Sequence, residues 1–186
     1  MADDLTILQQ MILPSATIPV STHAMSGEPQ IVLTEPTCAG SRVIIDGVPN
    51  DCIVIKVDDA FPAPTKLFAN TRHECKRADF AIFAEVGGKT VVILVEMKGG
   101  TGDHVVPQLK GAACTVAYCK EVGSLFWNEP DFLKQAELRY VAMRCIAIPK
   151  RQTGIDRSAP LHNKPDDPLF VRQNQVQFNQ LARAGA

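Results

Sequence analysis

The chain has 186 residues, of which 46% are hydrophobic and 21% are charged, and its formal net charge is −1. This length suits one well-packed domain, and the composition is typical of a soluble globular protein. No apolar run approaches the roughly 20 residues that cross a bilayer, and the acidic start does not resemble a signal peptide. We therefore expect a cytoplasmic protein without membrane association. The near-neutral charge excludes a strong overall attraction to nucleic acid.

The six cysteines lie mostly within apolar runs, and no CxxC pair occurs. Reduced cysteine in such runs behaves as a small hydrophobic residue, and an intracellular protein keeps it reduced. We expect buried free thiols rather than a zinc site or a disulfide framework.

The first 40 residues contain two predicted elements. Residues 5–13 predict a short helix, with Asp3 or Asp4 as its N-cap and Pro14 as its stop. The segment that follows is rich in Pro, Ser, Thr and Gly, and only "QIVLTE" within it reads as a strand.

Two β-branched runs come next, "SRVIIDG" and "DCIVIKVDD", joined by "GVPN". This pattern predicts a β-hairpin. Residues 59–78 then hold two prolines in "FPAP" and a basic cluster, which predicts a long loop. Loops of that length are uncommon in compact domains unless they have a function.

The strongest pattern is "ADFAIFAEVGGKTVVILVEMKGG", in which Gly87-Gly88 separates two strand-like runs. A Gly-Gly pair favours a two-residue hairpin turn. A helix is predicted over 105–121, with Pro107 in its first turn, and a buried strand over 139–150. The tail 151–186 is polar and is expected either to form a terminal helix or to dock on a partner.

These elements predict an α/β (α+β) fold with a mixed central β-sheet flanked by helices. We expect one domain over 1–186. Its core would span about 41–150, preceded by an N-terminal segment 1–40 and followed by the polar C-terminal tail.

The hairpin predicts which charged residues meet. If Gly87-Gly88 is the turn, Val86 pairs with Lys89, and the same register places Asp79 directly opposite Glu96. Opposed residues share a face with Cβ atoms about 4.5–5.5 Å apart, so the two carboxylates would repel in a purely structural sheet. A divalent cation removes that repulsion, and Mg²⁺ is commonly held by one or two carboxylates with phosphate oxygens and waters. A solvated salt-bridge cluster is the alternative.

An Asp near the start of one strand followed by Glu-x-Lys at the end of the next resembles the PD-(D/E)XK nuclease superfamily. The residues are Asp79 and Glu96-Met97-Lys98. The resemblance implies a restriction-endonuclease-like core. It also implies that Asp79, Glu96 and the backbone carbonyl of Met97 bind Mg²⁺, with Mn²⁺ as a substitute, while Lys98 lies beside the attacking water.

The predicted helix adds to this resemblance. Gln108-Leu109 is similar to the "QL" motif of the RecB-like branch, which implies a catalytic role for Gln108. The chain departs from the pattern in its first acidic residue, which many members carry on a helix before the core. Glu74 is a candidate for that role and Glu35 a weaker one, and the sequence does not decide between them.

Four basic residues near the predicted site are candidate phosphate contacts: Arg72, Lys76, Arg77 and Lys110. Such contacts supply affinity for nucleic acid without reading its sequence. A charge run of this kind is also common on a solvated face.

The function predicted from these features is metal-dependent hydrolysis of phosphodiester bonds, by a DNA endonuclease that acts as a homodimer or with a partner protein. One alternative is a catalytically silent nuclease-like module that binds nucleic acid or a partner protein. Another is a small interaction protein of unrelated fold, in which the pairing of the two carboxylates is accidental.

Overall fold

The computed structural model describes residues 3–36, 42–98, 104–144 and 161–183, and gives only the backbone for the last residue of the second and third ranges. The helices are α1 (Asp4–Met11), the 3-10 helix η1 (Pro14–Ala16), α2 (Val57–Ala60), α3 (Val105–Phe126) and α4 (Phe178–Ala182). The strands are β1 (Thr17–Ile18), β2 (Ser21–Thr22), β3 (Pro29–Thr34), β4 (Arg42–Asp46), β5 (Ile53–Lys56), β6 (Phe80–Val86), β7 (Lys89–Lys98), β8 (Glu137–Arg144), β9 (Leu169–Val171) and β10 (Gln175–Gln177).

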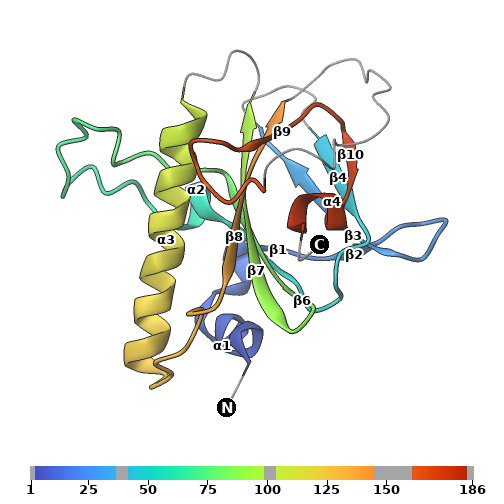
Figure 1. Ribbon diagram of the computed structural model, residues 1–186, viewed down its shortest axis with the longest axis horizontal. Helices are drawn as coiled ribbons and strands as arrows, with labels where there is room; N and C mark the ends of the chain where they lie inside the picture. Colours follow the sequence, from blue (N-terminus) through green and yellow to red (C-terminus); the bar gives the residue numbers. More distant parts are fainter. Residues whose placement is uncertain (1–2, 37–41, 99–103, 145–160, 184–186) are drawn as a thin grey trace.

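Two mixed sheets form the centre of the fold. The larger has six strands in the order β1-β5-β6-β7-β8-β9, and the smaller has four in the order β10-β4-β3-β2. In Figure 1, α3 covers one face of the larger sheet, and the smaller sheet with α4 lies on the other side. The expected α+β class with a mixed sheet flanked by helices is confirmed at this level.

The larger sheet combines an antiparallel meander with a parallel crossover. β5, β6 and β7 pair antiparallel in chain order. The chain then crosses through α3 and returns as β8, parallel to β7. A helical crossover of this kind places the carboxyl ends of β7 and β8 at the same edge of the sheet.

The predicted register of the long hairpin is confirmed. Val86 pairs with Lys89, and the ladder continues without a bulge to Phe80 opposite Val95. Gly87 and Gly88 have φ values of +60° and +77°, as a type I′ turn requires at both central positions. Along β7, odd-numbered positions face one core and even-numbered positions face the other, because successive side chains of a strand point to opposite faces.

The hairpin predicted from "GVPN" is wrong. β4 pairs with β3 and β10 in the smaller sheet, whereas β5 pairs with β1 and β6 in the larger one. The segment between them therefore joins two sheets instead of closing a turn. β4 pairs with β3, the strand before it, and β5 pairs with β6, the strand after it, so the chain passes from one sheet to the other between them.

Each face of the larger sheet has its own hydrophobic core. Ile82, Ile93 and Val95 face the smaller sheet and α4. Phe83 and Leu94 face the opposite way, onto α1 and α3. The helix predicted over 105–121 ends later than expected, at Phe126, and the predicted α1 begins with Asp3 as its N-cap, whose side chain accepts the N–H of Thr6.

The C-terminal segment is integrated into this core. Val171, Val176, Phe178 and Leu181 are buried, and β9 and β10 each add a parallel strand to one of the sheets. Of the two expectations for the polar tail, a terminal helix or docking on a partner, the structure shows the helix, α4. It lies beside the smaller sheet in Figure 1 and contacts β10 of that sheet and β7 and β8 of the larger one. Its buried positions, Phe178, Leu181 and Ala182, have helical spacing but are too few to predict this role.

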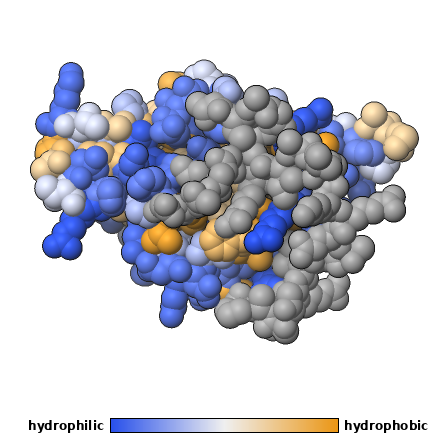
Figure 2. Space-filling view, turned by 90° about the horizontal axis from the view of Figure 1, so that it is seen from above, coloured by the Kyte–Doolittle hydropathy of each residue, from blue (hydrophilic) through white to orange (hydrophobic). Residues whose placement is uncertain are grey.

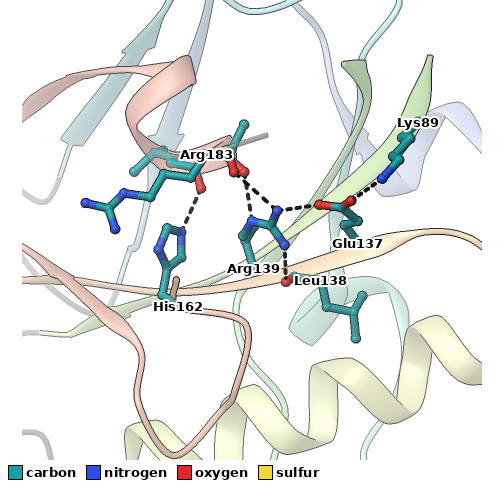
Figure 3. A network of polar contacts seen from close by, with 8 residues as sticks. Lys89, Glu137, Leu138, Arg139, His162 and Arg183 are labelled. Carbon is teal, nitrogen blue, oxygen red and sulfur yellow. Dashed lines mark hydrogen bonds and ion pairs between the residues drawn. The ribbon is translucent and has the colours of Figure 1, made fainter. Parts of the chain in front are cut away.

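A buried polar network fastens α4 to β8 (Figure 3). The Arg139 guanidinium donates to the carbonyls of Ala182 at 2.8 Å and Arg183 at 3.3 Å, and to the Glu137 carboxylate at 2.5 Å. His162 Nε2 lies 2.7 Å from the Leu181 carbonyl. These contacts satisfy carbonyls at the end of a helix, where no intrahelical partner exists.

Among the described cysteines, Cys52, Cys75 and Cys119 are buried and Cys114 is exposed, all as free thiols. Burial raises the pKa of Cys52 to about 12. The expectation of buried free thiols is confirmed for these three positions and is wrong for Cys114, while Cys38 and Cys145 lie outside the described residues. In the described part of the chain, no helix is long and apolar enough to span a bilayer.

Candidate active site

Asp79 and Glu96 meet at the end of the β6–β7 hairpin. Asp79 directly precedes β6, and Glu96 directly follows Val95, the residue of β7 that forms the last pair of the ladder with Phe80. Asp79 Oδ2 accepts the backbone N–H of Met97 at 2.6 Å, and the Asp79 carbonyl accepts the N–H of Val57 at 2.8 Å. The side chain of Asp79 is therefore bound to β7, and its backbone is bound to the first residue of α2.

The backbone of Met97 faces the Asp79 side of β7. Its N–H points there, as the hydrogen bond to Oδ2 demonstrates. The N–H and C=O of one residue in an extended strand leave on the same side. The Met97 carbonyl is therefore directed toward Asp79, as the sequence resemblance implies for a metal ligand.

Glu96 is buried, with 1% of its surface exposed. It follows Leu94 along β7 by two positions, so it points to the face that α3 covers. A carboxylate at such a position costs several kcal/mol when charged and alone, so burial of this residue needs compensation by a cation or hydrogen bonds. Lys98 is the last residue of β7 and lies opposite Arg144 of β8, and the structure describes its backbone only.

Gln108 lies in the first turn of α3, as predicted. The helix begins at Val105 after the N-cap His104, and the N–H of Gln108 donates to the His104 carbonyl at 3.2 Å. The side-chain oxygen of Gln108 is buried, and no hydrogen-bond partner lies among the described residues. The next residue, Leu109, is fully buried and anchors this turn on the sheet.

A groove of about 610 Å³ opens beside Asp79. Its wall carries three further carboxylates, those of Glu35, Asp58 and Asp59, together with Lys56. The sequence analysis does not predict Asp58 and Asp59 as neighbours of the site. The available signal is the acidic pair that ends "VIKVDD", directly after an apolar run. Glu35, the weaker sequence candidate for the first acidic residue, shares this groove with Asp79.

Glu74, the stronger sequence candidate, has a different role. Its two carboxylate oxygens accept the backbone N–H groups of Thr71 at 3.1 Å and Arg72 at 2.7 Å. Hydrogen bonds from backbone N–H groups, its own and that of Arg72 first, hold the pKa of Glu74 below its usual value. The carboxylate closes a turn of its own loop, which argues against metal ligation.

The four basic candidates differ in exposure and in their partners. Arg72 and Lys76 are exposed on the loop before Asp79. Arg77 is buried, and its guanidinium donates to the Cys75 carbonyl and to Asp58, both at 3.2 Å. This burial argues against the phosphate contact that the sequence predicts for Arg77. Lys110 is exposed and pairs with Asp166 at 2.8 Å.

Gly111 of α3 lets the loop before Asp79 pack closely against the helix. The sequence alone does not predict this contact. A Cβ at this position would lie 1.6 Å from the Lys76 carbonyl oxygen and 2.7 Å from its carbon. Only glycine lets the two backbones approach so closely. The helix thereby fixes the chain three residues before Asp79.

The donor set of Asp79 and Glu96 fits Mg²⁺. Both are hard oxygen ligands, and Mg²⁺ usually takes only one or two carboxylates from the protein and completes its shell with waters and phosphates. Within the described ranges, no three His, Cys, Asp or Glu side chains are grouped so that they could hold a metal by themselves.

Comparisons with known proteins identify no relative. No protein-family model, no curated protein and no solved structure matches the chain.

Proposed function

We propose that the protein is a metal-dependent nuclease that hydrolyses phosphodiester bonds, acting as a DNA endonuclease. The observation that carries the proposal is the 2.6 Å hydrogen bond between Asp79 Oδ2 and the Met97 N–H, which fixes a carboxylate beside Glu96 on the neighbouring strand. The meander β5–β6–β7 and the α3 crossover to β8 support a restriction-endonuclease-like core around this pair.

Each residue of the site would have a separate role in hydrolysis. Asp79, Glu96 and the Met97 carbonyl would hold Mg²⁺, with Mn²⁺ as a substitute. When bound, the ion supplies Lewis-acid polarisation of the phosphoryl group and lowers the pKa of a bound water. Lys98, two positions after Glu96, would orient the attacking water or stabilise negative charge that develops on the phosphorus centre. Gln108 would position the lysine or the water through its buried side-chain oxygen.

The geometry favours Glu35 over Glu74 as the additional acidic residue. Glu35 lines the groove beside Asp79, whereas the Glu74 carboxylate is occupied by the N–H groups of its own loop. We propose that Glu35 acts on the same ion through water. Substitution of groups that support a metal site in this way typically lowers metal affinity by about 10–100-fold.

The test is cleavage of supercoiled plasmid and of single-stranded DNA in Mg²⁺, Mn²⁺ or EDTA. Wild-type protein should cut only with metal, and Lys98→Ala and Glu96→Gln should abolish cutting. Glu85→Gln is the matched control, because Glu85 is an exposed acid at the other end of the same hairpin. Cleavage that persists in EDTA or in Glu96→Gln would refute the assignment.

A catalytically silent module that binds nucleic acid or a partner protein is the second candidate. One observation favours it: two carboxylates, rather than three, form the centre of the site. A silent module would bind DNA without cutting it under any metal, and its affinity would not change in Glu96→Gln.

A further inference from the structure

The loop that leads into the site exposes two adjacent apolar side chains. Leu67 is 78% exposed and Phe68 is 48% exposed. We call residues 61–76 the arm. Figure 1 shows it projecting outward from α2, past α3. In Figure 2, apolar and hydrophilic residues lie side by side at the end of the molecule where the arm projects.

Hydrogen bonds within the arm fix its shape. The N–H groups of Leu67 and Phe68 donate to the Pro64 carbonyl at 3.0 and 2.9 Å. Beyond them, the Cys75 N–H donates to Asn70 Oδ1 at 3.2 Å, and the Glu74 carboxylate closes the next turn. The two apolar residues are thus held in solvent by an ordered loop, at a cost that a folded protein normally avoids.

The arm is attached to α3 at both ends. At its start, the Phe61 ring lies 5.7 Å from the Tyr118 ring, between centroids. At its end, the Lys76 carbonyl lies against Gly111. Since Asp79 follows Lys76 by three residues, the arm and the candidate active site form one continuous structure.

The charge of the arm is positive. Lys66, Arg72 and Lys76 are all exposed, and Lys66 directly precedes the apolar pair. The only acidic residue of the arm is Glu74, whose carboxylate is bound by backbone N–H groups. Lysine is depleted in the cores of protein–protein interfaces, whereas nucleic-acid interfaces are strongly positive. The combination therefore favours nucleic acid over a protein partner.

We propose that the arm binds duplex DNA, with Lys66, Arg72 and Lys76 on the phosphates and Leu67-Phe68 inserted as a wedge against the base stack. Leucine and phenylalanine are among the residues that unstack base steps in this way. This inference rests on the proposed function, because it names the substrate of the same site as a locally unstacked duplex.

The experiment is carried out in EDTA, so that it does not depend on cleavage. A duplex carrying 2-aminopurine reports unstacking by a rise in fluorescence, and anisotropy of a labelled duplex reports affinity at several salt concentrations. The variants are Leu67→Ser with Phe68→Ser, and Lys66→Gln with Arg72→Gln and Lys76→Gln. Met25→Ser is the control, because Met25 is a 92% exposed apolar residue outside the arm.

We expect wild-type protein to raise the 2-aminopurine signal. The Leu67/Phe68 variant should lose that signal and about 10-fold or more in affinity, with its salt dependence unchanged. The triple charge variant should lower the slope of log K against log salt by up to about 2.7, at 0.9 for each lost phosphate contact. Met25→Ser should behave as wild type.

Equal binding and equal fluorescence in wild type and the Leu67/Phe68 variant would overturn the proposal, as would self-association that depends on these residues without any effect on DNA. Failure of this proposal can be distinguished from failure of the nuclease proposal. A wedge signal in a protein that never cuts DNA would support the arm and refute the nuclease, whereas unimpaired cutting and unstacking by the Leu67/Phe68 variant would do the reverse.

Discussion

The close approach of α3 and the arm at Gly111 gives the most specific structural prediction. In an ordinary helix, replacing Gly with Ala stabilises a protein by up to about 1 kcal/mol, because Ala has the higher helix propensity. At Gly111, however, the new Cβ would lie 1.6 Å from a backbone oxygen. Heavy atoms need about 3 Å or more, so one of the two backbones would have to move by more than 1 Å.

Overpacking of this kind costs about 1–3 kcal/mol, and here no flexible side chain can move aside. The clash therefore outweighs the gain in propensity, and Gly111→Ala should lower the free energy of unfolding. A chain of this length loses about 2–4 °C in melting temperature for each kcal/mol. The displaced backbone is that of Lys76, so metal binding at Asp79 should weaken as well.

The assay is urea and thermal unfolding of Gly111→Ala together with a reverse control in the same helix. Ala117→Gly removes propensity at an exposed position and should cost about 1 kcal/mol without affecting metal binding. If Gly111→Ala proved as stable as wild type, or more stable, the described packing of the arm on α3 would be refuted.

Three further predictions concern the C-terminal network and the loop before Asp79. Arg139→Met should cost about 3 kcal/mol, because it leaves the carbonyls of Ala182 and Arg183 without their buried donor, and hydrogen exchange should show faster opening of α4. Burial lowers the pKa of His162, so the unfolded chain binds a proton at this residue more readily than the folded protein does. The contribution of neutral His162 to the free energy of unfolding should therefore be complete above pH 6.5 and decrease below it, by at most about 1.4 kcal/mol per pH unit. His162→Asn should flatten this part of the plot of unfolding free energy against pH. Glu74→Ala should leave Mn²⁺ affinity unchanged in calorimetry, since its carboxylate binds the N–H groups of Thr71 and Arg72, and a loss of metal binding would contradict this assignment.

The sequence predicted the site because its geometry is local. A Gly-Gly turn and continuous apolar strands determine the register of one hairpin, and the last pair of that register, Phe80 with Val95, directly adjoins Asp79 and Glu96. The same reasoning placed Gln108 in the first turn of a helix, since Pro107 and the apolar spacing mark where it begins.

Non-local contacts were not predictable in this way. The sequence predicts that β4 and β5 pair with each other, yet β4 pairs with β10 and β5 pairs with β1, both far away along the chain. The sequence predicts Arg77 as a surface cation, but the residue is buried and its guanidinium forms an ion pair with Asp58. The role of Gly111 depends on a loop that precedes it by 35 residues along the chain, from Lys76. No periodicity records such an approach.

The most direct test of the central claim is calorimetric titration of Mn²⁺ into wild-type protein, Asp79→Asn and Glu85→Gln. Asn at position 79 retains an oxygen that can accept the Met97 N–H, so it removes the charge while preserving the strand contact. We expect a metal site in wild type and in Glu85→Gln that is lost in Asp79→Asn. Absence of metal binding in wild type, or undiminished binding in Asp79→Asn, would contradict it.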